Sequence, residues 1–263
     1  MFSRYYGIFI SRIKESFIYR FSSFVQVIAS GISLFIIWYI WKAIYASAGT
    51  TSIGGFAFPE MMTYMTLSVI FNMVLATFQE HEIEREVRSG KIATYLIKPV
   101  SYPLVCFTRT IAGKTSQIFT RLIPLLIVAF FIIKISIPVS WIFLLSLGLG
   151  YLINYNLVFL TGLMTFWTKG NIWGVRLSRT VIVSIFSGSL LPLIMFPEWF
   201  VEIANMLPFI AMFHIPASIY LGSIASTDII SSLLLQGFWL ILLTSFTFIV
   251  WKRAEKKMFI QGG

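Results

Sequence analysis

Residues Phe21–Trp41, FSSFVQVIASGISLFIIWYIW, contain no charged side chain. A helix needs roughly 20 such residues to cross the 30 Å or so of hydrocarbon in a bilayer, so this stretch predicts a membrane-spanning helix. Four more uncharged stretches are long enough, or nearly long enough, to span: 61–79, 135–168, 180–197 and 229–251. Within 135–168, Pro138 and Trp141 place the predicted helix at 140–167.

A sixth span is predicted at 116–133, where Arg121 is the only interruption before Lys134. Arg121 falls within the first two turns, where its stem can extend to the head groups. It thereby avoids the cost of about 2.5–3.5 kcal/mol that a charge meets at the bilayer centre. The predicted fold is therefore an all-α membrane protein with six transmembrane helices.

The composition excludes a soluble protein. The chain is 58% apolar, 17% aromatic and 11% charged, whereas a soluble domain carries about 25% charged residues. The net charge of +10 lies in the segments between the apolar runs, so we expect no nucleic-acid partner. The single cysteine, Cys106, excludes an internal disulfide, and charges within the first 20 residues lead us to expect no cleavable signal peptide.

The distribution of basic residues predicts the orientation. With six spans and a cytoplasmic N-terminus, every lysine and arginine except Lys42 and Lys134 falls on the cytoplasmic side. The uncharged stretch 203–227 is long enough to be a seventh span, but it would move the last four basic residues outside. We therefore expect 198–226 to form a broken, partly re-entrant hairpin on the outer side, with both chain ends in the cytoplasm.

Residues 1–20 alternate aromatic and aliphatic side chains with basic ones at mostly helical spacing. This pattern predicts an amphipathic helix in the cytoplasmic membrane interface. Two interpretations stay open: a plain flanking anchor, or a helix that transmits motion from a cytoplasmic partner.

The segment after the second span, residues 80–99, concentrates charge of both signs. Four of the ten acidic residues of the chain fall here, and Glu84 and Arg88 have the favoured i,i+4 spacing of a helical ion pair. Ser89-Gly90 is a natural helix stop. A loop that served only for retention would need basic residues alone, so the pattern favours a surface helix that contacts a protein partner over a solvated loop.

The stretch EREVRSGKIATYLIKPVSYP, residues 84–103, resembles the segment after the second span of bacterial ABC transporter type-2 permeases, where a G-x-[IL]…L-[IL]-[KR]-P run follows a coupling helix. The order of spans, the N-terminal helix and the outer hairpin resemble the same family. The resemblance implies a bacterial cytoplasmic (inner) membrane location and a separate ABC ATPase subunit. The positions implied to face that ATPase are Glu82, Glu84, Arg85, Arg88, Gly90, Lys91, Leu96 and Pro99.

Three other patterns carry less chemistry. Ala112-Gly113-Lys114-Thr115 matches the end of a phosphate-binding loop, but Thr108 stands at the first required glycine and no strand precedes it. His81 and His214 lack Cys or Asp neighbours at metal-ligand spacing, and the acids Glu198 and Glu202 lie on the outer hairpin. We expect no nucleotide site, metal, cofactor or catalytic residue in this chain.

Polar residues inside the predicted spans are amides and hydroxyls. Asn72, Asn154 and Asn156 form helix–helix hydrogen bonds or line a substrate path, and the sequence leaves both open. Gly148 and Gly150 indicate close approach of neighbouring helices.

The leading hypothesis is the permease subunit of an ATP-driven exporter, which forms half of a pathway and requires a second permease. The related branch favours a heterodimer over a homodimer. Alternatives are an ion-coupled secondary transporter, which usually keeps ionisable residues in mid-membrane, a membrane-embedded enzyme, and a membrane assembly protein. An apolar, aromatic-rich interior favours a lipid, drug or hydrophobic peptide as substrate over a sugar or ion.

Overall fold

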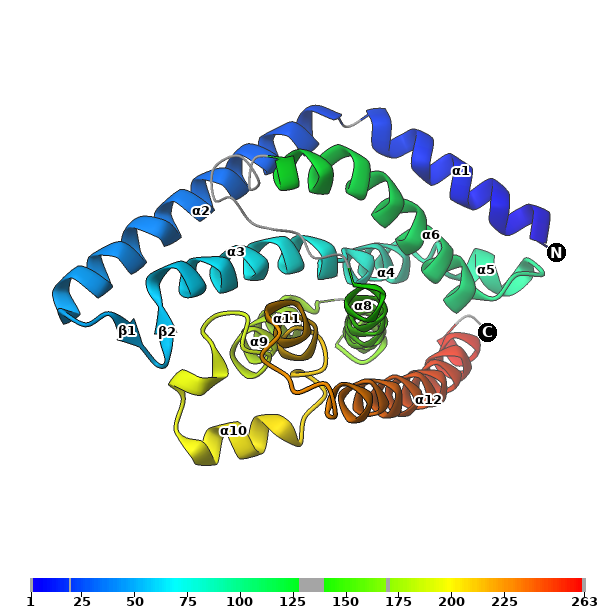
Figure 1. The fold of residues 1–263 in the computed structure, drawn as a ribbon. Helices are drawn as coiled ribbons and strands as arrows, with labels where there is room; N and C mark the ends of the chain where they lie inside the picture. The colour runs from blue at the N-terminus through cyan, green and yellow to red at the C-terminus, as the bar shows by residue number, and fades with distance from the viewer. Residues whose placement is uncertain (1, 19, 128–139, 169–170, 262–263) are drawn as a thin grey trace.

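The computed structural model describes residues 2–18, 20–127, 140–168 and 171–261, and these parts of the chain are mostly helical (Figure 1). The only strands among them, β1 (Ser52–Ile53) and β2 (Phe56–Ala57), form a small antiparallel hairpin. The helices are α1 (Phe2–Ile18), α2 (Arg20–Ala48), α3 (Phe58–Leu75), α4 (Gln79–Arg88), α5 (Ala93–Ile97), α6 (Tyr102–Gln117), the π-helix η1 (Ile118–Leu122), α8 (Trp141–Leu163), the 3₁₀-helix η2 (Met164–Phe166), α9 (Trp173–Phe186), the 3₁₀-helix η3 (Leu193–Met195), α10 (Glu198–Asn205), α11 (His214–Leu221) and α12 (Ile229–Gln261).

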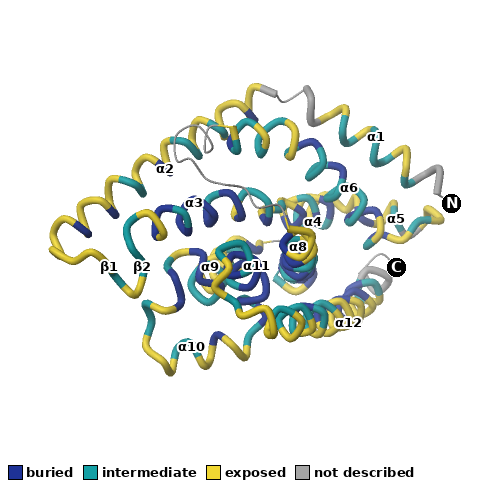
Figure 2. The backbone as a smooth tube through the Cα atoms, viewed as in Figure 1, coloured by how far each residue is buried: buried dark blue, intermediate teal, exposed yellow. Residues whose placement is uncertain are grey.

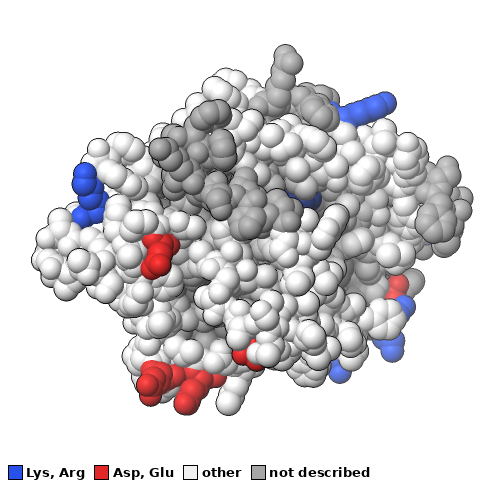
Figure 3. Space-filling view, in the orientation of Figure 1, with Lys and Arg blue, Asp and Glu red and all other residues white. Residues whose placement is uncertain are grey.

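Four helical stretches within the described residues are long and apolar enough to cross a membrane: Phe21–Ala48, Phe58–Arg88, Trp141–Phe166 and Ile229–Lys257. They coincide with four of the six predicted spans. Only 11% of the apolar window of the first is buried and 22% of the last, against 56% in the other two. Figure 2 accordingly shows exposed residues along α2 and α12, with α3 and α8 buried between them. The face drawn in Figure 3 carries few charged side chains, as a surface in contact with lipid requires.

The other two predicted spans have different outcomes. The prediction at 116–133 runs into residues 128–139, which lie outside the described part of the chain. The prediction of one continuous helix at 180–197 is wrong, because α9 ends at Phe186. The chain turns at Gly188, whose φ of +78° is in the left-handed region, and Pro192 cannot continue a helix.

Side chains of α3 bond the non-helical backbone that follows α9. The hydroxyl of Tyr64 donates to the carbonyl of Gly188 at 2.7 Å, and the Ser68 hydroxyl donates to the carbonyl of Ser189. Irregular backbone among apolar helices is stable only when its polar groups find partners inside the protein. These two bonds therefore hold the break in place against α3.

The predicted hairpin at 198–226 contains two short helices, α10 and α11, with turns between them. Gln236 of α12 is fully buried and links the neighbouring segments, since its amide donates to the carbonyl of Ser146 at 3.1 Å and to that of Ala211 at 2.7 Å. Residues 198–226 thus contain two short helices in place of one continuous helix, and the re-entrant arrangement and its position relative to the membrane stay predictions.

Both ends of the chain pack at the start of α6. The hydroxyl of Tyr5 in α1 accepts a hydrogen bond from the backbone amide of Ser101 at 3.1 Å. The ring of Trp251, near the end of α12, stacks on Tyr102 with 5.1 Å between centroids. Figure 1 shows the two termini on the same side of the molecule as α5. A common side for both ends is what the predicted topology requires.

Two nearby glycines of α8 differ in how closely other parts of the chain pack against them. A Cβ atom at Gly150 would lie 2.8 Å from the carbonyl oxygen of Met212, whereas a Cβ at Gly148 would meet nothing within 4 Å. The close approach predicted from these two glycines is observed at Gly150, and Gly148 has no neighbour at that distance within the described part of the chain.

We expect Gly150→Ala to lower the stability of the purified protein by about 1–3 kcal/mol, because the new methyl group must displace backbone. Gly148→Ala is the matched control in the same helix and should leave stability unchanged or raise it by up to about 1 kcal/mol. Thermal unfolding in detergent measures both. Equal melting temperatures for the two variants would contradict this packing.

Candidate functional site

The acidic residues of α4 bind arginines from the rest of the fold. Three of its four glutamates pair with three different helices, α9, α1 and α6. These pairs are Glu80–Arg179 at 2.9 Å, Glu82–Arg12, and Glu86–Arg109 at 2.8 Å. The fourth, Glu84, lies 3.9 Å from Arg88 of the same helix, as its spacing predicted. Ion pairs thus connect the short helix α4 to α1, α6 and α9.

Glu86 is the most heavily bonded of these carboxylates. Its side chain is 7% exposed and accepts hydrogen bonds from Tyr102 at 2.8 Å, Tyr95 at 3.2 Å and Arg109 at 2.8 Å. Burial lowers the pKa of Arg109, but the hydrogen bond and the charge of Glu86 raise it by more, so the guanidinium stays charged. Burial, with the charge and hydrogen bond of Glu86 adding to it, raises the pKa of the Tyr102 hydroxyl well above its usual value. The cluster is an ion pair, Glu86–Arg109, whose carboxylate also accepts hydrogen bonds from the neutral hydroxyls of Tyr95 and Tyr102.

The opposite side of the same segment is open. We call it the α4–α5 surface, and it combines exposed basic groups with an exposed isoleucine. Gly90, with φ of +69°, makes the turn between the two helices, as the Ser89-Gly90 stop predicted. Ile97, the last residue of α5, is 87% exposed and is the large apolar side chain of this surface. Its members are Arg88, Gly90, Lys91, Thr94, Ile97 and Lys98.

The residues that the resemblance implied for partner contact fall into two groups. Arg88, Gly90, Lys91 and Pro99 are exposed on or beside the α4–α5 surface. Three others turn inward or toward cavities: the side chains of Glu82 and Glu84 are 14% and 16% exposed, and Arg85 lines two cavities between α4, α6 and α1. The side chain of Leu96 lies outside the described residues.

Between α3 and α4 the helix is interrupted at 76–78. The break frees backbone carbonyls at the end of α3, and two side chains bond them. Lys114 donates to the carbonyls of Met73 at 3.1 Å and Ala76 at 2.7 Å, and Asn154 donates to that of Leu75 at 2.6 Å. A cation at the C-terminal end of a helix is also favoured by the helix dipole. Lys114 and Asn154 therefore act as the cap of α3.

The three asparagines proposed for a pathway are separated. Asn72 and Asn154 line one cavity of about 410 Å³ between α3, α8 and α9. Asn156 instead donates to Thr244 of α12 at 3.2 Å, which is a helix–helix hydrogen bond. The sequence alternatives thus divide: Asn156 links helices, Asn154 caps α3 and lines the cavity, and Asn72 lines it.

Sequence reasoning missed the partners of the glutamates. Arg12, Arg109 and Arg179 counted only as positive charges on the cytoplasmic side, and Lys114 counted as part of a false phosphate-binding motif. That motif lies inside α6, so it forms a helix and no loop. The composition did indicate such pairing: the chain has fewer acidic than basic residues, so each carboxylate could be expected to form an ion pair. Among the described residues, no group of three or more His, Cys, Asp or Glu side chains is placed to hold a metal ion.

Comparison with known families gives one match. Residues 27–262 match the family model described as ABC-2 family transporter protein. The matched range begins within α2 and continues to the last residues of the chain, so it includes the α4–α5 surface and the cavity beside Asn72. No curated protein matches the chain.

We expect Glu86→Gln to destabilise the purified protein by about 3–5 kcal/mol, because it leaves the charge of Arg109 buried without a counter-charge. Glu84→Gln is the matched control on the same helix. Its partner Arg88 is 66% exposed at 3.9 Å, so the loss should stay below about 1 kcal/mol. Thermal unfolding of both variants measures the difference.

The double variant Glu86→Gln/Arg109→Met should recover part of the lost stability, because it removes the stranded charge. A double variant no more stable than Glu86→Gln alone would contradict the pairing.

Proposed function

The chain belongs to the ABC-2 family of transporter proteins, and from that premise we propose that it is the membrane-spanning permease subunit of an ATP-driven exporter. Membership makes it a multi-pass component of an ABC transporter and implies an ABC ATPase partner; we propose that ATP is hydrolysed in that partner. Direction of transport, the docking site and the subunit arrangement are our proposals.

The observation that carries the proposal is the two-sided character of α4 and α5. On one side, three glutamates of α4 pair with arginines of α1, α6 and α9. On the other, the α4–α5 surface presents Ile97 among the basic groups Arg88, Lys91 and Lys98. An ATPase groove with an apolar floor and an acidic rim is the complementary partner.

Docking at this surface gives ATP binding a mechanical route into the membrane helices. An ATPase pair that closes on ATP displaces α4 and α5, and the ion pairs carry α1, α6 and α9 along with them. Glu82, Glu84 and Arg85 then act inside the permease, while Arg88, Gly90, Lys91 and Pro99 meet the ATPase directly. Leu96 is proposed as a contact on the strength of the family resemblance alone. The pathway alternates between inward and outward access as these helices move.

One chain supplies half of the pathway, so the transporter requires a second permease, and we favour a related chain over an identical copy. Asn72 and Asn154 face the cavity of about 410 Å³ that we assign to this half. The protein is placed in the bacterial cytoplasmic membrane with both termini in the cytoplasm, because all but two of the basic residues then lie inside. The apolar, aromatic-rich composition of the chain favours a lipid, drug or hydrophobic peptide as substrate.

We expect an ABC ATPase to co-purify with the tagged chain from its native host, and Ile97→Glu to reduce that recovery roughly tenfold or more. Burying an isoleucine contributes about 1.5–3 kcal/mol, and a carboxylate near an acidic rim would also repel. Quantitative mass spectrometry of the purified complex measures the ATPase-to-permease ratio. Met206→Glu is the matched control, since Met206 is 75% exposed on the predicted outer hairpin.

The site is tested separately by cross-linking. Cys106 is the single cysteine and is fully buried, so a cysteine at position 97 or 206 is the reactive thiol in otherwise unaltered protein. A photoreactive label should join the ATPase from Ile97→Cys and not from Met206→Cys. Equal cross-linking from both would refute the docking site. Vesicle transport that continues without ATP and stops when the proton gradient collapses would refute ATP-driven export.

A further inference from the structure

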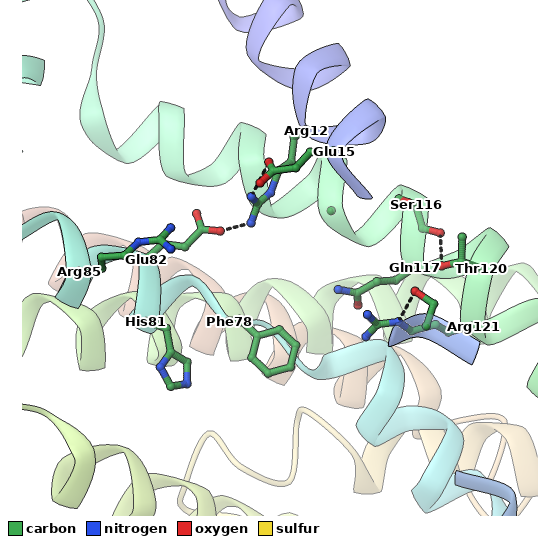
Figure 4. A pocket seen from close by; sticks show the side chains of 12 residues that line it. Arg12, Glu15, Phe78, His81, Glu82, Arg85, Ser116, Gln117, Thr120 and Arg121 are labelled. Carbon is green, nitrogen blue, oxygen red and sulfur yellow. Dashed lines mark hydrogen bonds and ion pairs between the residues drawn. The ribbon is translucent and has the colours of Figure 1, made fainter. Parts of the chain in front are cut away.

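A cavity of about 380 Å³ lies where α1, α2, α4 and α6 meet (Figure 4). It adjoins the cavity assigned to the pathway, with which it shares the lining residues Phe78 and His81. Its lining includes Arg12 and Glu15 of α1 and Ser23 of α2, so it lies near the junction at which the amphipathic helix is followed by the first apolar span. In the predicted topology this junction lies at the cytoplasmic surface of the bilayer. A cavity of this size is in the range that holds a small ligand or a head group.

The cavity carries an excess of positive charge. Its lining includes three arginines and two glutamates. Both glutamates, Glu15 and Glu82, already bind Arg12. Within the described residues, Arg121 donates to neutral groups, the hydroxyl of Ser23 at 3.2 Å and the amide oxygen of Gln26. Arg85 forms no ion pair within the described part of the chain. Arg85 and Arg121 are thus without a carboxylate partner among the described residues, and the three arginines outnumber the two glutamates by one.

The wall formed by α6 and η1 adds polar groups and space. Ser116 is 2% exposed, and its hydroxyl has no hydrogen-bond partner among the described residues. Gly113 faces the cavity without a side chain, and a Cβ there would meet nothing within 4 Å. Thr120 and Arg121 belong to the π-helix η1, a form that is rare and often found at functional sites. Figure 4 shows Arg121 and Arg12 extending toward the same space from different helices.

One phenylalanine lines this polar site: Phe78, which is 53% exposed. Phe24 and Phe119 are next in sequence to the lining residues Ser23 and Thr120, and they are 60% and 61% exposed on α2 and η1. In the predicted topology such exposed apolar side chains face lipid, so acyl chains lie within reach of the cavity. Guanidinium groups bind phosphate through paired, charge-assisted hydrogen bonds.

We infer that this cavity binds the phosphate-bearing head group of an anionic phospholipid from the leaflet on the side of the chain termini. A free phosphate shares the recognition chemistry, but Phe78 in the lining and the exposed phenylalanines of α2 and η1 favour a ligand with acyl chains. The site lies against Glu82, so an occupied head group adds negative charge beside the ion pair that joins α1 to α4. This inference does not depend on where the ATPase docks, and its test contains no ATPase.

The test is lipid binding to the full-length protein purified in detergent. Phosphatidylglycerol and phosphatidylcholine of equal chain length are titrated in mixed micelles, and native mass spectrometry counts the lipids retained. We expect one phosphatidylglycerol to be retained in preference to phosphatidylcholine. Arg85→Gln and Arg121→Gln should each weaken that binding roughly tenfold, the value of one charge-assisted hydrogen bond. Gly113→Leu should abolish it by filling the cavity.

Gly148→Leu is the control, because its side chain enters open space on α8, away from the cavity. It should retain lipid as the unaltered chain does. Arg85 is exposed and forms no ion pair, so its variant stays informative if Arg121→Gln or Gly113→Leu fails to fold. Retention of phosphatidylglycerol unchanged in Arg85→Gln, or no preference over phosphatidylcholine, would overturn the inference. Inorganic phosphate that displaces the lipid at millimolar concentration would assign the site to a free anion and overturn the lipid as occupant.

Discussion

The pairing of three α4 glutamates with arginines from three other helices is the interaction on which the charged end of the molecule depends. In a chain with 11% charged residues, an unpaired carboxylate among apolar helices would cost several kcal/mol. Glu80 and Glu86 are 4% and 7% exposed, so neither can rely on water. The packing of α1, α6 and α9 around α4 therefore places one arginine beside each of three α4 carboxylates.

The same constraint acts on the backbone wherever a helix is interrupted. After α9, hydroxyl groups of α3 bond the free carbonyls, and after α3, Lys114 and Asn154 do so. Each break is bonded by a helix distant in sequence, so breaks and packing contacts occur together. A bilayer-exposed break would have no such partner. The interruptions are thus part of the packing of the fold, as the apolar faces are.

The sequence predicted features whose cause is local. Uncharged runs predicted four long apolar helices, and Ser89-Gly90 predicted the end of α4. Features that depend on distant contacts were not predictable. Arg12 and Glu82 are 70 residues apart, and Arg179 and Glu80 are 99 apart. The break after Leu75 has neither proline nor glycine, so only its cap by Lys114 and Asn154 explains it. In 180–197, hydropathy outweighed the turn residues Gly188 and Pro192, which is why the break of α9 was missed.

The break between α3 and α4 also decides how force can travel. A continuous helix would transmit any push on α4 straight along α3, whereas the interrupted chain at 76–78 lets α4 tilt separately. Tilting α4 alone would separate Glu80 and Glu86 from their arginines and leave buried charges unpaired, at a free-energy cost of several kcal/mol for each pair. Moving α4 together with α1, α6 and α9 preserves every pair and strains only the break. Within the proposed mechanism the ion pairs therefore select the collective motion, and the capped break after α3 is where that motion is absorbed.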